Sequence, residues 1–147
     1  MNFNKLKKLS GDASFRYFYR KKYFKQSSVF VYCKKQKKIN LVIYDAINNL
    51  LIKNNLLAPK LIRSNYKKNY IEIEDFGDLT VFQLLRKKQV NQLFYYKKIL
   101  LLLKKIQKIK TKKTKTFINT EYKIPNYSKE ILNNEANLFL KWYMPEF

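Results

Sequence analysis

Two short segments combine a glycine with polar or acidic residues, and each has the composition of a nucleotide-binding turn. The first spans residues 9–16 and reads Leu-Ser-Gly-Asp-Ala-Ser-Phe-Arg, with one of the chain's two glycines at position 11. A turn of small residues lets backbone N–H groups approach phosphate oxygens, because no large side chain stands in the way. The same composition is common in ordinary hairpins, so by itself this segment predicts only a turn.

The second segment spans residues 71–78 and reads Ile-Glu-Ile-Glu-Asp-Phe-Gly-Asp. Its alternation predicts a strand with Ile71 and Ile73 on one face and the glutamates on the other. One interpretation of the following residues is a plain strand-to-helix loop in which Asp78 caps the helix. The other is a hinge between two lobes, whose backbone hydrogen-bonds a nucleotide base and whose acidic residues lie beside a cleft.

Several kinds of chemistry are excluded by residue types that the chain lacks. It contains no histidine and a single cysteine, Cys33. An internal disulfide is therefore impossible, a zinc site lacks its usual ligands, and no serine–histidine or cysteine–histidine nucleophile pair can form. The four aspartates stand at positions 12, 45, 75 and 78, and none follows. We predict no metal site in this chain.

The elements that would position these segments form a mixed pattern. Aromatic and β-branched runs predict strands, whereas apolar residues at helical spacing, such as Ile39, Ile43 and Ile47, predict helices. The predicted strands cover residues 4–9, 15–20, 28–33, 60–63 and 70–74; the predicted helices cover 39–54, 79–87, 91–109 and 128–143, with a polar loop at 110–115. This order predicts an α+β fold: a five-stranded antiparallel sheet with one helix, followed by a helical region.

The predicted domain boundary falls at residue 78, between a sheet unit (1–78) and a helical unit (79–147). The last helix is expected to begin at a Ser128 cap and to expose Phe139, Trp142 and Tyr143. Exposed apolar surface of this kind favours association, so we expect the purified chain to be oligomeric or poorly soluble. The preceding helix carries an apolar stripe made of Leu93, Tyr96, Leu100, Leu103 and Ile106.

The net charge of the chain is +22, a value typical of proteins that bind nucleic acid or anionic surfaces. The basic residues, however, are 28 lysines and only 4 arginines, and Asn, Ile, Tyr and Phe are abundant, as A/T-rich codons would produce. Nucleic-acid readers favour the planar fork of arginine. We therefore attribute most of the charge to composition and expect no nucleic-acid partner, while a basic module that binds RNA or a protein stays open as the alternative.

Nothing in the sequence predicts a membrane segment. No apolar run approaches the roughly 18 residues that would span a bilayer, and the first residues lack the apolar stretch of a signal peptide. We expect a cytoplasmic protein with no membrane partner.

Taken together, the two segments and the order of elements resemble the aminoglycoside phosphotransferase superfamily of kinases. The chain looks closest to bacterial members that phosphorylate the cell-wall amino sugars N-acetylmuramate and N-acetylglucosamine. The matching motifs are Gly-Asp-Ala-Ser-Phe-Arg at 11–16, the Ala58-Pro59 pair, and the acidic hinge at 74–78, with Phe76 as its one change. A late helix with Tyr127, Glu135, Phe139, Trp142 and Tyr143 is also similar to that group, so the resemblance covers almost the whole chain.

The resemblance implies a kinase-like fold that holds ATP, in the intact family together with Mg²⁺, between two lobes. The turn at 11–14 would lie over the phosphates, and the backbone at 74–76 would meet the adenine, with Val31 and Ile73 as walls of the base pocket. The nucleotide-binding residues implied in this way are Gly11, Asp12, Ala13, Ser14, Arg16, Glu74, Asp75 and Phe76.

The chain departs from the superfamily pattern in two places. Many kinases of this fold carry a lysine in the third strand that pairs with phosphates; here the interior of that strand is aromatic and aliphatic, which leaves Arg16 or Arg20 as replacements. The histidine-containing catalytic loop and the acidic metal site also have no counterpart, so we predict no catalytic residue. The resemblance thus implies an N-terminal fragment of an ATP-dependent sugar kinase, with weak ATP binding at most. A separate chain would have to supply the missing lobe before a sugar acceptor could react.

Overall fold

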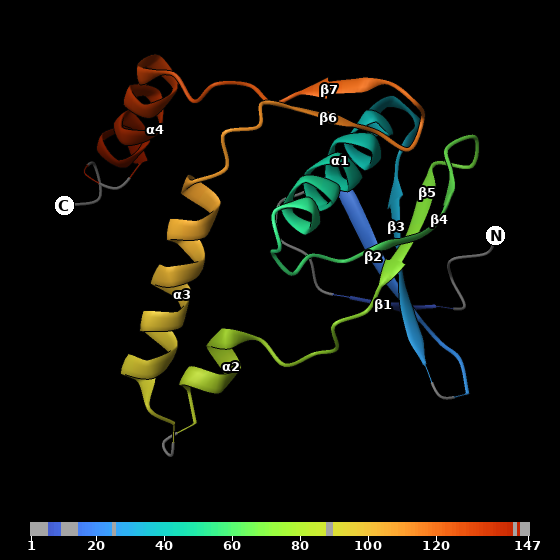
Figure 1. The fold of residues 1–147 in the computed structure, drawn as a ribbon, viewed down its shortest axis with the longest axis horizontal. Coiled ribbons are helices and arrows are strands. Elements are labelled where there is room, and N and C mark those ends of the chain that lie inside the picture. The colour runs from blue at the N-terminus through green and yellow to red at the C-terminus, as the bar shows by residue number, and fades with distance from the viewer. Residues whose placement is uncertain (1–5, 10–14, 25, 88–89, 143, 145–147) are drawn as a thin grey trace.

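The computed structural model describes residues 6–9, 15–24, 26–87, 90–142 and 144 (Figure 1). These residues form a five-stranded antiparallel sheet with strand order β1-β2-β3-β5-β4. A single helix, α1 (Ile39–Lys53), joins β3 to β4 and crosses one face of the sheet (Figure 1). The strands are β1 (Lys7–Lys8), β2 (Arg16–Lys22), β3 (Ser27–Cys33), β4 (Leu61–Asn65) and β5 (Tyr70–Glu74). The predicted α+β class and the antiparallel sheet are confirmed.

The hydrophobic core lies between the sheet and α1. Strand residues alternate in direction, so Val29 and Val31 of β3 face α1 together with their partners Ile73 and Ile71 of β5. All four are at most 7% exposed, and Leu41 of α1 packs against them. The sequence prediction placed Val31 and Ile73 in the walls of a base pocket. Because both are packed into this core, neither presents a surface to a nucleotide.

Two asparagines end elements by adopting left-handed backbone conformations. Asn55 has a φ of 57° and follows α1, where the predicted stop is confirmed. Asn69 has a φ of 60° and closes the hairpin between β4 and β5. Asparagine tolerates this region better than other residues with a Cβ, which explains its use at both sites.

Three further helices follow the sheet: α2 (Val81–Leu85), α3 (Gln92–Gln107) and α4 (Lys129–Trp142). Thr80 caps α2 in a reciprocal arrangement with Gln83, in which each side chain accepts a hydrogen bond from the other's backbone N–H. The expectation that Asp78 caps this helix is therefore wrong. The predicted cap of α4 is confirmed, since Ser128 Oγ accepts a hydrogen bond from the backbone N–H of Ile131 at 3.2 Å.

A two-stranded hairpin replaces part of the predicted polar loop at 110–115. It pairs β6 (Lys113–Lys115) with β7 (Glu121–Lys123) and lies along α1 (Figure 1). Thr114 and Thr116 are buried, and Phe117 packs against the core and edge-to-face with Tyr66, at a ring distance of 6.1 Å. The sequence did not predict strand β6 because its lysines are exposed and give it the composition of a loop; only the threonine between them is buried.

Helices α3 and α4 lie away from the sheet, and neither buries a described residue (Figure 1). The predicted stripe on α3 is helical but uncovered; its members range from Leu93, 62% exposed, to Ile106, 39% exposed. Among the described residues, no helix has the length and apolar composition needed to cross a bilayer. The exposed stripe is therefore a surface of the described fold that still lacks a covering partner.

Candidate functional site

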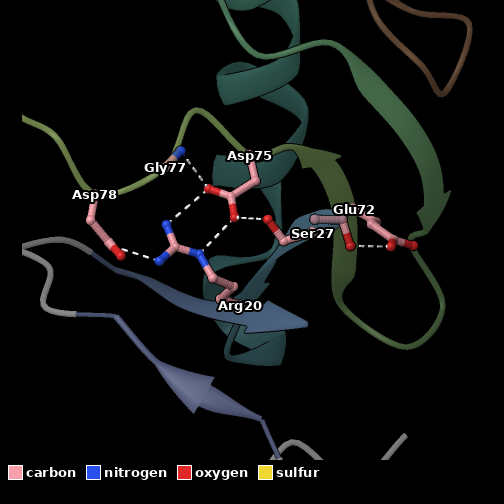
Figure 2. A network of polar contacts seen from close by, with 7 residues as sticks. Arg20, Ser27, Glu72, Asp75, Gly77 and Asp78 are labelled. Carbon is pink, nitrogen blue, oxygen red and sulfur yellow. Dashed lines mark hydrogen bonds and ion pairs between the residues drawn. The ribbon is translucent and has the colours of Figure 1, made fainter. Parts of the chain in front are cut away.

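An arginine from β2 fixes the segment that follows β5 (Figure 2). The guanidinium of Arg20 donates two hydrogen bonds to the carboxylate of Asp75, from Nε at 2.6 Å and from Nη2 at 2.9 Å. Its Nη1 donates a third, 2.6 Å long, to Asp78. The fork of arginine matches a carboxylate in this two-point geometry, so the contact fixes the direction of the segment as well as its position.

The carboxylate of Asp75 is the centre of the network. It also accepts hydrogen bonds from Ser27 Oγ at 2.6 Å and from the backbone N–H of Gly77 at 2.9 Å. Burial alone would raise the pKa of Asp75, but the hydrogen bonds from Arg20, Ser27 and Gly77 outweigh it and lower the pKa to about 2. The hydrogen bonds to Asp75 and Asp78 raise the pKa of Arg20 above its usual value, so Arg20 and Asp75 are both ionised at any physiological pH.

The two ends of the segment differ in their surroundings. The side chain of Asp75 is 3% exposed, whereas that of Asp78 is 69% exposed. The hydrogen bond from Arg20 lowers the pKa of Asp78 as well, but solvent screens this outer contact. Between them, Gly77 has a φ of 81°, a left-handed value that a residue with a Cβ adopts only under strain.

The backbone of Phe76 is available to a ligand. The backbone N–H of Glu74 donates to Lys60 O at 3.0 Å, which continues the sheet to the end of β5. Within the described part of the chain, the backbone N–H and C=O of Phe76 make no hydrogen bond, and its side chain is 51% exposed. A donor and an acceptor held on one anchored residue are what an aromatic base needs for edge recognition.

The predicted site residues fall into three groups. Gly11, Asp12, Ala13 and Ser14 lie outside the described residues. Glu74, Asp75 and Phe76 are brought together in the anchored segment. Arg16 lies apart from this segment. It is opposite Cys33 in the register of β2 with β3, at the far end of β2, and its guanidinium lies over the ring of Tyr44, 5.0 Å from the centroid.

The sequence offers Arg20 as a replacement for the phosphate-pairing lysine, but in the structure Arg20 has a different role. Its guanidinium contacts two carboxylates, so it acts as a clamp on the segment after β5. The sequence contains no signal for this pairing, because 55 residues separate Arg20 from Asp75. Only the antiparallel pairing of β2, β3 and β5 brings them together.

Glu72 belongs to a second polar network on the sheet face opposite α1. It is 2% exposed and accepts hydrogen bonds from Tyr23, Ser28 and Arg63. Burial would raise the pKa of Glu72, but these hydrogen bonds lower it below the usual range. The carboxylate is held by these three hydrogen bonds, and together with Ser28 and Arg63 it lines an open pocket of about 550 Å³ on this face.

The part of the chain that the structure describes contains no group of three or more potential metal ligands. Asp75 and Asp78 are already paired with Arg20. Compared with known proteins, the chain matches no family model and no curated protein.

Proposed function

We propose that this chain is the nucleotide-facing N-terminal part of an ATP-dependent small-molecule phosphotransferase of the aminoglycoside phosphotransferase type, with a sugar as the acceptor of the complete enzyme. The observation that supports this most directly is the anchored segment after β5. Arg20 and Asp75 hold it in place, and the backbone of Phe76 stays available for the edge of an adenine. Such pre-ordering lowers the entropic cost of binding a base.

The position of Arg16 is consistent with a nucleotide lying along the sheet. Arg16 precedes Arg20 by four residues in β2, which at strand spacing corresponds to about 13 Å. An extended nucleoside triphosphate likewise carries its base and its terminal phosphates at opposite ends. In the proposed pose the base lies at Phe76, and the phosphates lie toward Arg16 and the turn at 11–14.

The chain by itself has a binding role and no catalytic one. Phosphoryl transfer needs a carboxylate at the acceptor hydroxyl and carboxylates around Mg²⁺. No histidine occurs, no aspartate follows position 78, and the described residues contain no ligand cluster for a metal. These groups would have to be supplied by residues other than 1–147. We expect weak ATP binding here and no sugar phosphorylation.

The backbone of Phe76 can be tested with a matched pair of substitutions. Phe76→Pro removes the N–H group, whereas Phe76→Ala removes the ring and keeps the N–H. Titration with a fluorescent ATP analogue in the absence of Mg²⁺ should show a loss of affinity of about tenfold for Phe76→Pro, since a lost hydrogen bond costs about 1 kcal/mol or more. Phe76→Ala should bind within about threefold of the unaltered chain if the backbone is the main contact.

Far-UV circular dichroism on both variants would show that the sheet is intact. Equal affinities for the two variants would exclude base recognition by this peptide. ATP-dependent phosphorylation of an amino sugar by purified residues 1–147 alone, unchanged on further purification, would contradict the proposal that these residues bind the nucleotide without catalysing transfer.

A second candidate is a basic module that binds RNA. It is favoured by the charge distribution, because residues 79–120 contain many lysines and no acidic residue. Filter binding of a single-stranded RNA at increasing salt tests whether the chain binds RNA. Neutralisation of several phosphates would make affinity fall steeply with salt, whereas absence of binding at low salt would exclude an RNA-binding role.

A further inference from the structure

An open, apolar groove lies where α1 meets the end of α3, the segment that joins α3 to β6, and the chain leaving β7. We call it the α1–α3 groove. Its volume is about 570 Å³. Its apolar walls include Ile47 and Leu51 of α1, Ile106 of α3, and Ile124, while Lys110 and Lys112 stand beside them. A groove of this composition fits an apolar helix that also carries a negative charge.

Helix α4 has that composition. Its residues Ile131, Leu138 and Trp142 recur at intervals of seven and four and so share one face, and they are 41%, 51% and 76% exposed. Glu135 lies within the same face, four residues after Ile131 and three before Leu138. Its carboxylate accepts one hydrogen bond, from the hydroxyl of Tyr127. Burial of this face would require a cation near Glu135.

The lysines beside the groove supply such a cation. Within the described residues, neither Lys110 nor Lys112 forms an ion pair. An α4 helix in the groove would place apolar side chains against Ile106 and Ile124, and Glu135 within reach of these lysines. The face of α4 and the α1–α3 groove therefore complement each other in apolar surface and in charge.

The chain's own α4 cannot easily turn back into this groove. Asn126 already lines the groove, and α4 begins at Lys129. The residues between them are fixed to the start of α4, since Tyr127 binds Glu135 and Ser128 caps the helix. Little chain is left to reverse its direction. In the structure α4 lies apart from α1 (Figure 1).

We propose that the α1–α3 groove binds α4 of a second copy of this chain. In a two-fold arrangement each copy inserts its helix into the groove of the other, so two grooves and two helices are covered at once. The proposal concerns assembly and does not depend on the nucleotide site. Because each copy carries a net charge of +22, the two repel at long range, and association should strengthen as salt rises.

The chain's single tryptophan makes the contact directly observable. Trp142 is the only tryptophan and is 76% exposed. On dilution of the full chain, its emission should move to longer wavelength, and its quenching by acrylamide should increase. Light scattering across the same concentrations should show the mass falling from two copies to one.

A matched pair of substitutions on α3 locates the contact. Ile106→Asp places a charge in the groove, whereas Leu101→Asp makes the same change at a residue that does not line it and is 56% exposed. Ile106→Asp should weaken association by about tenfold or more, and Leu101→Asp by much less. Glu135→Lys should also weaken association, and Lys110→Glu together with Lys112→Glu should restore it.

Three outcomes would overturn the proposal. A chain that stays monomeric at every concentration does not pair in this way, even if its tryptophan responds to another protein or to anionic vesicles. A blue-shifted emission that does not depend on concentration would show docking within one chain. Equal weakening by Ile106→Asp and Leu101→Asp would place the interface elsewhere on α3.

Discussion

The contact between Arg20 and Asp75 should contribute a measurable and pH-dependent part of the stability of the sheet. Asp75 has a pKa of about 2 in the folded chain, against 3.8 for an unperturbed aspartate. A difference of this size corresponds to about 2 kcal/mol of unfolding free energy, at ~1.4 kcal/mol per pKa unit. We therefore expect Asp75→Asn to destabilise the chain by about 2 kcal/mol at pH 7, and by more if the buried Arg20 is poorly compensated by Asp78, its remaining and solvent-exposed partner.

The direction of the pH dependence follows from the lowered pKa. The stabilisation is complete above the pKa of the unfolded state, near 3.8, and is lost as pH falls toward the folded value near 2. At pH 2 the contribution of the ionised carboxylate should shrink to well under half of its value at pH 7. The difference between the unaltered chain and Asp75→Asn should therefore nearly vanish there.

Urea denaturation followed by far-UV circular dichroism is the suitable assay. Guanidinium would screen the ion pair, and the fluorescence of Trp142 reports on α4 instead of the sheet. Asp78→Asn is the matched control, because it removes a second carboxylate from Arg20 at an exposed position and should have a smaller effect. Equal effects of the two substitutions, or a loss of stability in Asp75→Asn that persists at pH 2, would refute the reasoning.

Two further stability predictions concern positions outside the site. Asp45 of α1 is 1% exposed; burial raises its pKa, and the hydrogen bond from Asn49 only partly offsets this. Burial therefore destabilises the folded chain once pH rises above the pKa that Asp45 has in the unfolded state. In urea titrations, Asp45→Asn should stabilise the chain by about 1 kcal/mol at pH 7 and by less at pH 4. Lower stability of the variant at pH 7 would contradict this. Asn69 has a φ of 60°, so Asn69→Gly should be tolerated, whereas Asn69→Val should lower the unfolding free energy by about 1–2 kcal/mol. Equal thermal unfolding midpoints for the two variants would argue against a strained turn.

The sequence was sufficient for much of the local structure. The strand Tyr70–Glu74 was predicted with its observed bounds, because alternating isoleucine and glutamate fit only a two-sided strand. The start of α4 followed from Ser128, whose hydroxyl satisfies a backbone N–H that would otherwise lack a partner. These features depend on neighbours within a few positions, and such neighbours are visible in the sequence.

Contacts between residues far apart in the chain could not be predicted from the sequence. Asp78 looked like a helix cap, and only the proximity of β2 shows that it contacts Arg20 while Thr80 caps α2. The hairpin of β6 and β7 was missed because its lysines are exposed, and only α1 provides the surface that covers Thr114.

The sequence by itself determined the order of the elements apart from the β6–β7 hairpin, the composition of the segment at 71–78, and the absence of histidine and of late aspartates. The tertiary structure decided what those residues contact. It assigned Asp75 to Arg20, placed Val31 in the core, and left the faces of α3 and α4 uncovered. The physical reason is that hydrogen bonding and periodicity along the chain select local conformation. Which side chains are buried together depends on how strands and helices pack, and the pairing of residues 55 positions apart has no local signature.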